Sequence, residues 1–164
     1  MSLSAMIKSL QRSQSGGTLG TYVFEPAAVA PANAWRTIFT VTGGNVLMTM
    51  LIGETTIAEG TGASNLDMQI DPTAAGAVAA LCAATVINND IVGTLYTFTG
   101  VPTDGCYAAL SVPGGMVGGL AAQGFHGWVV PPGAVQWRES AAVPDHAVQW
   151  YMFYVPIDRG ANVT

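Results

Sequence analysis

The feature that most constrains this chain is a series of short runs rich in β-branched and aromatic residues. Turn-forming residues interrupt the runs at spacings of about 8–12 residues. The series begins near residue 36 and continues to the end of the 164-residue chain. This pattern is typical of antiparallel sandwiches and barrels. We therefore predict an all-β fold for residues 36–164, either an antiparallel β-sandwich or a jelly-roll-like barrel.

The first expected strands lie on either side of a glycine-rich turn. Residues 36–42 and 46–52 flank Gly43-Gly44-Asn45, and glycine and asparagine tolerate the positive φ of hairpin turns. Gly53-Glu54 predicts a second turn, which leads into a strand at 55–58.

Beyond residue 60, some segments clearly predict strands and one is ambiguous between helix and strand. Residues 65–71 alternate strictly, which predicts a strand with Leu66, Met68 and Ile70 on its buried face. Alanine-rich residues 73–86 fit either helix or strand, and their β-branched residues favour strand. Further strands are expected at 95–100, 106–112 and 128–130.

The sequence AVQW occurs at residues 134–137 and again at 147–150. The copies are too close together to be domain repeats. We interpret them as the two arms of a hairpin closed by residues 143–146. Such a turn predicts that His146 is solvated.

The N-terminal region differs from the rest. Residues 1–20 predict a short helical or extended arm that ends at Gly16-Gly17, and 21–35 predict an extended connector to the β-sandwich domain at 36–164. The arm either packs on its own domain or docks on a neighbouring subunit. Four apolar residues at helical spacing form its stripe: Leu3, Met6, Ile7 and Leu10.

Two expected strands, 46–52 and 150–155, are apolar on both faces. A strand of an antiparallel sheet normally has one face in water, so these two must be covered twice. The second cover is either a loop or arm of the same chain, or another subunit, and interface cores favour aromatic residues and methionine. The candidate interface residues are Leu3, Met6, Ile7, Leu10, Met48, Met50, Tyr151 and Phe153.

The composition excludes two classes of partner. Charged residues make up only 9% of the chain and its net charge is −5, which disfavours nucleic acid. Although the mean hydropathy is +0.40, no apolar run approaches the roughly 18 residues of a membrane span.

Catalytic and ligand-binding patterns are not found. His126 and His146 have no zinc-like spacing, and Gly-rich residues 114–119 match no phosphate-binding loop. We expect no catalytic, cofactor-binding or metal-binding residue and no enzyme activity. Cys82 and Cys106 are interpreted as free buried thiols.

Several stretches resemble small β-rich virion proteins encoded among the head genes of tailed bacteriophages. The resemblance rests on IFTVTGGNVL at 38–47, IGETT at 52–56 and VQWYMFYVPID at 148–158. Shorter matching pieces lie at 81–84, 92–96, 99–100, 160–161 and 163–164.

This resemblance implies a structural virion protein, specifically a capsid decoration (cement) protein on the outside of a phage head. It further implies a homotrimer that binds the major capsid protein and is made in the host cytoplasm. The alternative is a receptor- or glycan-binding β-sandwich of a phage fibre or tail. In that case Trp128, Trp137 and Trp150 would form an exposed cluster that stacks on sugar rings; the other interpretation is that these tryptophans are core residues.

Overall fold

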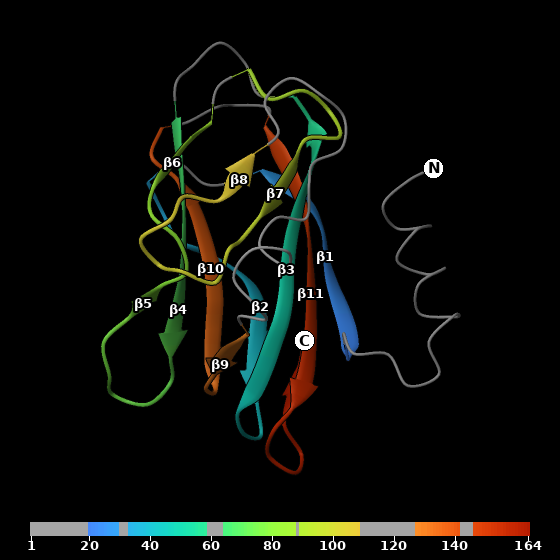
Figure 1. The fold of residues 1–164 in the computed structure, drawn as a ribbon, viewed down its shortest axis with the longest axis vertical. Coiled ribbons are helices and arrows are strands. Elements are labelled where there is room, and N and C mark those ends of the chain that lie inside the picture. Colours follow the sequence, from blue (N-terminus) through green and yellow to red (C-terminus); the bar gives the residue numbers. More distant parts are fainter. Residues whose placement is uncertain (1–19, 30–32, 59–63, 88, 109–126, 142–145) are drawn as a thin grey trace.

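The computed structural model describes residues 20–29, 33–58, 64–87, 89–108, 127–141 and 146–164. The described residues form strands and no helix, arranged as two antiparallel sheets packed face to face (Figure 1). The prediction of an all-β sandwich is therefore confirmed. The strands are β1 (Thr21–Val29), β2 (Arg36–Thr42), β3 (Val46–Ile57), β4 (Ser64–Pro72), β5 (Ala79–Ala80), β6 (Thr85–Ile87), β7 (Leu95–Thr97), β8 (Tyr107–Ala108), β9 (Trp128–Val130), β10 (Gly133–Glu139), β11 (Ala147–Pro156) and β12 (Asn162–Val163).

The strands divide between sheet A, toward the right of Figure 1, and sheet B, toward the left. Sheet A has the order β1-β11-β3-β7-β8, and β9 also pairs with β3. Sheet B has the order β12-β2-β10-β4-β5, and β6 also pairs with β4.

The connectivity is that of a jelly roll. Strands pair as though one long hairpin had been rolled up: β1 with β11, β2 with β10, β3 with β7, and β4 with β5 and β6. Contacts between β11 and β3, and between β10 and β4, then complete the two sheets. Jelly rolls occur in viral capsid and lectin domains, so this topology is compatible with several functions.

The main core lies between the sheets and follows from alternation along the strands. Leu66, Met68 and Ile70 of β4 are buried, as the sequence predicts. Trp137 and Trp150 are fully buried at the centre, with ring centroids 5.4 Å apart and the rings edge to face. Edge-to-face contact is a favoured aromatic geometry, so this pair links the two layers of the sandwich.

The two AVQW copies do not form a hairpin. The copy at 134–137 lies in β10 of sheet B, and the copy at 147–150 lies in β11 of sheet A. Each copy directs its tryptophan into the same core from opposite sides. The repeat therefore reflects two strands with the same inward alternation rather than two strands that pair with each other.

The predicted turn at Gly53-Glu54 is also wrong, because β3 runs without a break from Val46 to Ile57. A Cβ atom at Gly53 would lie 2.7 Å from Cζ3 of Trp150. Glycine at this position therefore makes room for the buried indole on the neighbouring strand.

Other expected elements are shorter or differently placed. Residues 73–86 are mostly bends and irregular backbone, and only β5 and part of β6 lie within them. Part of the expected connector forms β1, which pairs with β11 at the edge of sheet A. The strand expected at 95–100 is limited to β7, although Tyr96 and Phe98 do pack on one face against the core. Of the strand expected at 106–112, β8 is described and residues 109–112 lie outside the described residues.

Candidate functional site

The outer face of sheet A, turned away from the main core, carries a second apolar cluster. Its buried members are Ile52, Leu95, Tyr151 and Phe153, and Tyr22 and Met50 pack against them. We call these six residues the outer cluster. The Tyr22 and Phe153 rings lie 5.9 Å apart, and the exposed ring of Phe24 lies 6.2 Å from that of Tyr151. Sheet A therefore has apolar side chains on both faces.

Three of the predicted interface residues, Met50, Tyr151 and Phe153, meet in the outer cluster. However, Tyr151 and Phe153 are each only 2% exposed within the single chain. Both side chains are therefore covered within the single chain and are not exposed to a partner. Of the remaining five, Leu3, Met6, Ile7 and Leu10 lie outside the described residues, and Met48 is placed elsewhere.

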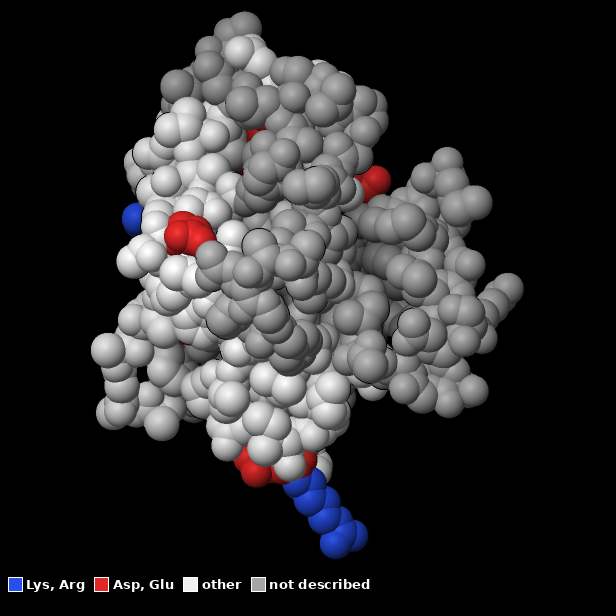
Figure 2. Space-filling model, in the orientation of Figure 1, with Lys and Arg blue, Asp and Glu red and all other residues white. Residues whose placement is uncertain are grey.

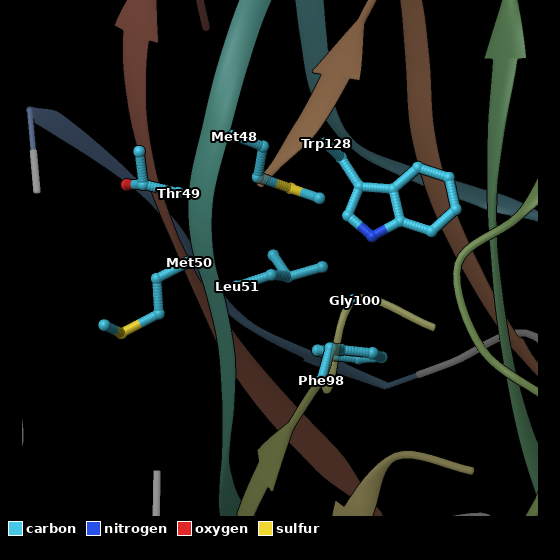
Figure 3. A pocket seen from close by; sticks show the side chains of 7 residues that line it. All are labelled: Met48, Thr49, Met50, Leu51, Phe98, Gly100 and Trp128. Atoms are coloured by element: carbon cyan, nitrogen blue, oxygen red, sulfur yellow. The ribbon is translucent and has the colours of Figure 1, made fainter. Parts of the chain in front are cut away.

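Met48 does not belong to this face, although strict alternation would place it beside Met50. The register between β11 and β3 shifts because Phe153 pairs with Met50 and Tyr154 pairs with Met48, which leaves Thr49 as an extra residue. A β-bulge of this kind reverses the alternation. Figure 3 shows Met48 directed toward Trp128, on the side of β3 opposite to Met50. Met48 accordingly lies in the main core at 4% exposure.

Near one end of sheet A, this face also carries an accessible row of aliphatic side chains. Leu47 of β3 pairs with Val129 of β9 on one side and with Val155 of β11 on the other. Val129 is 59% exposed and Val155 is 38% exposed. We call these three residues the aliphatic row. Since Val155 lies two residues beyond Phe153 on β11, the row continues the outer cluster into solvent.

One polar pair interrupts the other end of the face. The Tyr151 hydroxyl donates to Oε2 of Glu54 at 3.5 Å. Burial raises the pKa of the Glu54 carboxyl above its ordinary value, and the Tyr151 hydrogen bond opposes this rise. Burial, together with the Glu54 charge, raises the pKa of Tyr151 to about 12. The hydroxyl therefore stays protonated at neutral pH.

The outer face of sheet B has the opposite character. Gln69 donates to Gln136 at 2.7 Å, and Gln136 donates to Thr37 at 3.3 Å, so an amide ladder crosses three strands. Beside it, Arg138 Nε donates to Asp67 at 2.9 Å. Figure 2 shows few charged side chains among the described residues on the face of the molecule that it presents. The two outer faces of the sandwich thus differ: one is polar and hydrogen-bonded, and the other is apolar.

Of the two interpretations of the three tryptophans, the structure bears out the core position and not the exposed cluster. Trp137 and Trp150 are fully buried, and Trp128 is partly buried against the main core. They therefore cannot form an exposed platform. Trp35, which the sequence did not single out, is the tryptophan of the polar face, where Arg138 Cζ lies 4.6 Å from its ring centroid.

His146 is fully buried, in contrast to the solvated turn position expected for it. Its Nδ1 lies 2.6 Å from Oε1 of Glu139, and its Nε2 lies 3.3 Å from the Tyr96 hydroxyl. That hydroxyl donates to Asp90 at 2.6 Å. A buried chain of hydrogen bonds therefore links β10 of sheet B to β7 of sheet A. All four side chains are inaccessible to a substrate, so we interpret the chain as structural.

The reactive groups of the described residues are similarly enclosed. Cys82 and Cys106 are free and buried, as the sequence predicts. Burial raises their pKa values to about 12 and about 11, so both remain thiols at neutral pH. No group of three or more His, Cys, Asp or Glu side chains in the described residues is placed to hold a metal ion. His126 and residues 114–119 lie outside the described residues.

Comparison with protein-family models, curated proteins and solved structures gives no match to this chain. Within the described ranges, no helix has the length and apolar character needed to cross a membrane. The case for a function therefore rests on the fold, the two outer faces and the composition.

Proposed function

We propose that the protein is a structural assembly module without catalytic activity, and that its copies associate through the outer face of sheet A. The observation that carries the proposal is the aliphatic row, an exposed apolar strip on the side of the sandwich opposite the polar face of sheet B. Apolar side chains aligned across neighbouring strands offer an area that loses contact with water when a partner covers it.

The occupant that fits the aliphatic row best is a second copy of the chain. The net charge is −5, so two copies repel each other least where they meet through uncharged surface. The exposed Phe24 ring and the aliphatic row belong to the same sheet face, and aromatic residues are enriched in interface cores. We propose a homotrimer: closed symmetry covers the apolar strip of every copy, and the choice of three subunits rests on the resemblance to phage head proteins, because quasi-threefold positions recur across such shells.

At the finer level, we propose a capsid decoration protein on the head of a tailed bacteriophage, bound to the major capsid protein. The resemblance to phage head-gene products supports this role, and the jelly-roll topology and low charge are compatible with it. Residues 1–20 would then hold the shell, because their apolar stripe and the basic Lys8 and Arg12 are separated from the sandwich by Gly16-Gly17.

The first test is the native mass of the purified chain by sedimentation and native mass spectrometry. We expect three chains of 16.9 kDa for the unmodified protein. Val129→Asp should give monomers, because burying an unpaired carboxylate in an interface is strongly unfavourable. The matched control is Val86→Asp, since Val86 on sheet B is 63% exposed, close to the 59% of Val129. A folded, concentration-independent monomer for the unmodified chain would overturn the proposal of self-association.

The second test concerns the phage shell. The unmodified chain should co-sediment with tailed-phage capsids that lack decoration, whereas a chain lacking residues 1–20 should fold and trimerise but bind the capsids more weakly. Equal binding by the shortened chain would remove the arm from the proposal. Co-sedimentation with host cell envelopes and not with capsids would contradict the decoration role.

A further inference from the structure

The polar face of sheet B contains a hollow of about 290 Å³ beside Trp35. Its polar lining comes from neighbouring strands, with Asp67 and Gln69 on β4 and Arg138 on β10. Val78, which precedes β5, and Ala80 of β5 supply an apolar side. The volume is close to the lower end of the range of about 300–1,000 Å³ found for small-molecule sites.

The polar groups in the hollow are already held in place. The Arg138 guanidinium carbon lies over the Trp35 ring, 4.6 Å from its centroid, and the guanidinium pairs with Asp67, while Gln69 is held by its hydrogen bond to Gln136. A ligand would therefore meet oriented donors and acceptors without ordering them first, which lowers the entropic cost of binding.

The charges in the hollow select the class of ligand. Arg138 and Asp67 are 2.9 Å apart and neutralise each other, so the hollow offers no net charge to an anion or a cation. The ligand should therefore be neutral. It should also have one apolar face for Trp35 or Val78 and several hydroxyl groups for the amide and the ion pair.

We propose that this hollow binds a single neutral pyranose unit of a glycan. A pyranose ring carries C–H groups on one face, which pack against an aromatic ring, and hydroxyl groups around its edge. A nucleotide also stacks on indole, but its phosphate is disfavoured by a chain of net charge −5. The proposal concerns sheet B alone and does not rest on the assembly proposed for sheet A.

The test is a titration of the ¹⁵N-labelled full-length protein with the methyl glycosides of glucose, galactose, mannose and N-acetylglucosamine, followed by NMR. At least one glycoside should cause saturable shifts of the Trp35 indole N–H and the Gln69 side-chain amide. The indole N–H signals of buried Trp137 and Trp150 should not move. Weak, millimolar affinity is expected, equivalent to about −4 kcal/mol.

Two variants separate binding in the hollow from adsorption to any exposed aromatic side chain. Trp35→Ala should weaken binding at least tenfold, or about 1.4 kcal/mol. Phe24→Ala removes a ring that is 48% exposed on the opposite sheet and should leave the affinity unchanged. If Trp35→Ala does not fold, the shifts measured on the unmodified protein still decide the question.

Three outcomes would overturn the proposal. The first is the absence of saturable shifts with all four glycosides at concentrations up to about 100 mM, a hundred times the expected dissociation constant. The second is a response of Trp35 to adenosine and to none of the sugars, which would indicate a nucleobase site. The third is an equal loss of binding in Phe24→Ala and Trp35→Ala.

Discussion

Replacing Gly53 by alanine tests the packing at the centre of the sandwich. The added Cβ would lie 2.7 Å, 2.9 Å and 3.0 Å from Cζ3, Cη2 and Cε3 of Trp150. Carbon atoms pack favourably at about 3.5–4.0 Å, so either the indole or strand β3 must move. Trp150 is fully buried, and its ring is flanked by Trp137 at 5.4 Å and Phe98 at 6.2 Å. The ring therefore has little room to retreat.

The size of the effect follows from two opposing contributions. Forcing a methyl group into a well-packed core costs about 1–3 kcal/mol. Replacing glycine also restricts the unfolded chain, which stabilises the fold by about 0.4–1 kcal/mol. We therefore expect Gly53→Ala to lower the free energy of unfolding by about 1–2 kcal/mol. For a chain of this length, the melting temperature should fall by about 2–8 °C.

The assay is urea denaturation followed by tryptophan fluorescence, with Gly76→Ala as the matched control. At Gly76 the nearest atom to an added Cβ is 3.6 Å away, which is ordinary contact, so this variant should be neutral or slightly stabilised. Combining Gly53→Ala with Trp150→Phe removes the ring that the methyl group meets. The two changes should therefore cost less together than the sum of their separate costs. Equal midpoints for Gly53→Ala and the unmodified protein would refute the reasoning.

Three further outcomes concern buried groups. Tyr96→Phe leaves a buried oxygen of Asp90 without its hydrogen-bond donor and should lower the free energy of unfolding by about 1–3 kcal/mol. Urea denaturation measures this change, and an unchanged midpoint would contradict the buried chain of hydrogen bonds. Burial raises the pKa values of Cys82 and Cys106 to about 12 and about 11, so the native protein should resist iodoacetamide near pH 8. After denaturation without reductant it should take up two labels, as measured by intact mass. Rapid labelling of the native protein would contradict this prediction. Burial also raises the pKa of Glu54 in the folded protein above its pKa in the unfolded chain. The protonated carboxyl therefore contributes its full stability at a pH below the unfolded pKa, and this stability is lost as the pH rises through the folded pKa. Glu54→Gln should therefore raise the melting temperature near pH 7 and change it little near pH 3, and the reverse order would show that the carboxylate is stabilising.

The sequence predicts strands well where burial depends only on neighbours along the chain. Residues 36–42 form β2 with the predicted bounds, and alternation places Leu66 and Met68 in the core. Strand pairing was harder to predict, because it depends on residues far apart in the sequence. The two AVQW copies have the same inward pattern, which fits two strands of one hairpin and two strands of opposite sheets equally well.

The sequence predicted only part of the candidate site, again because strand pairing depends on residues far apart in the chain. Apolar residues on both faces of 150–155 predict that both faces are covered, and Tyr151 and Phe153 do lie in a cluster separate from the main core, while their role at an interface stays a prediction. The bulge at Thr49 depends on the register with β11, so Met48 could not be separated from Met50 by spacing alone. Val129 lies in a short strand that gives no sign of exposure in the sequence. Its place in the aliphatic row follows only from its pairing with Leu47.

The two proposed surfaces are separated by the thickness of the sandwich, and this separation has a consequence for assembly. The aliphatic row lies on the outer face of sheet A, and the Trp35 hollow lies on the outer face of sheet B. Between them is the main core, in which Trp137 and Trp150 pack closely and resist deformation. A partner that covers sheet A therefore leaves the hollow, on the opposite outer face of the sandwich, uncovered. If both proposals hold, each subunit of a trimer joined through sheet A keeps its sugar-binding hollow open to solvent.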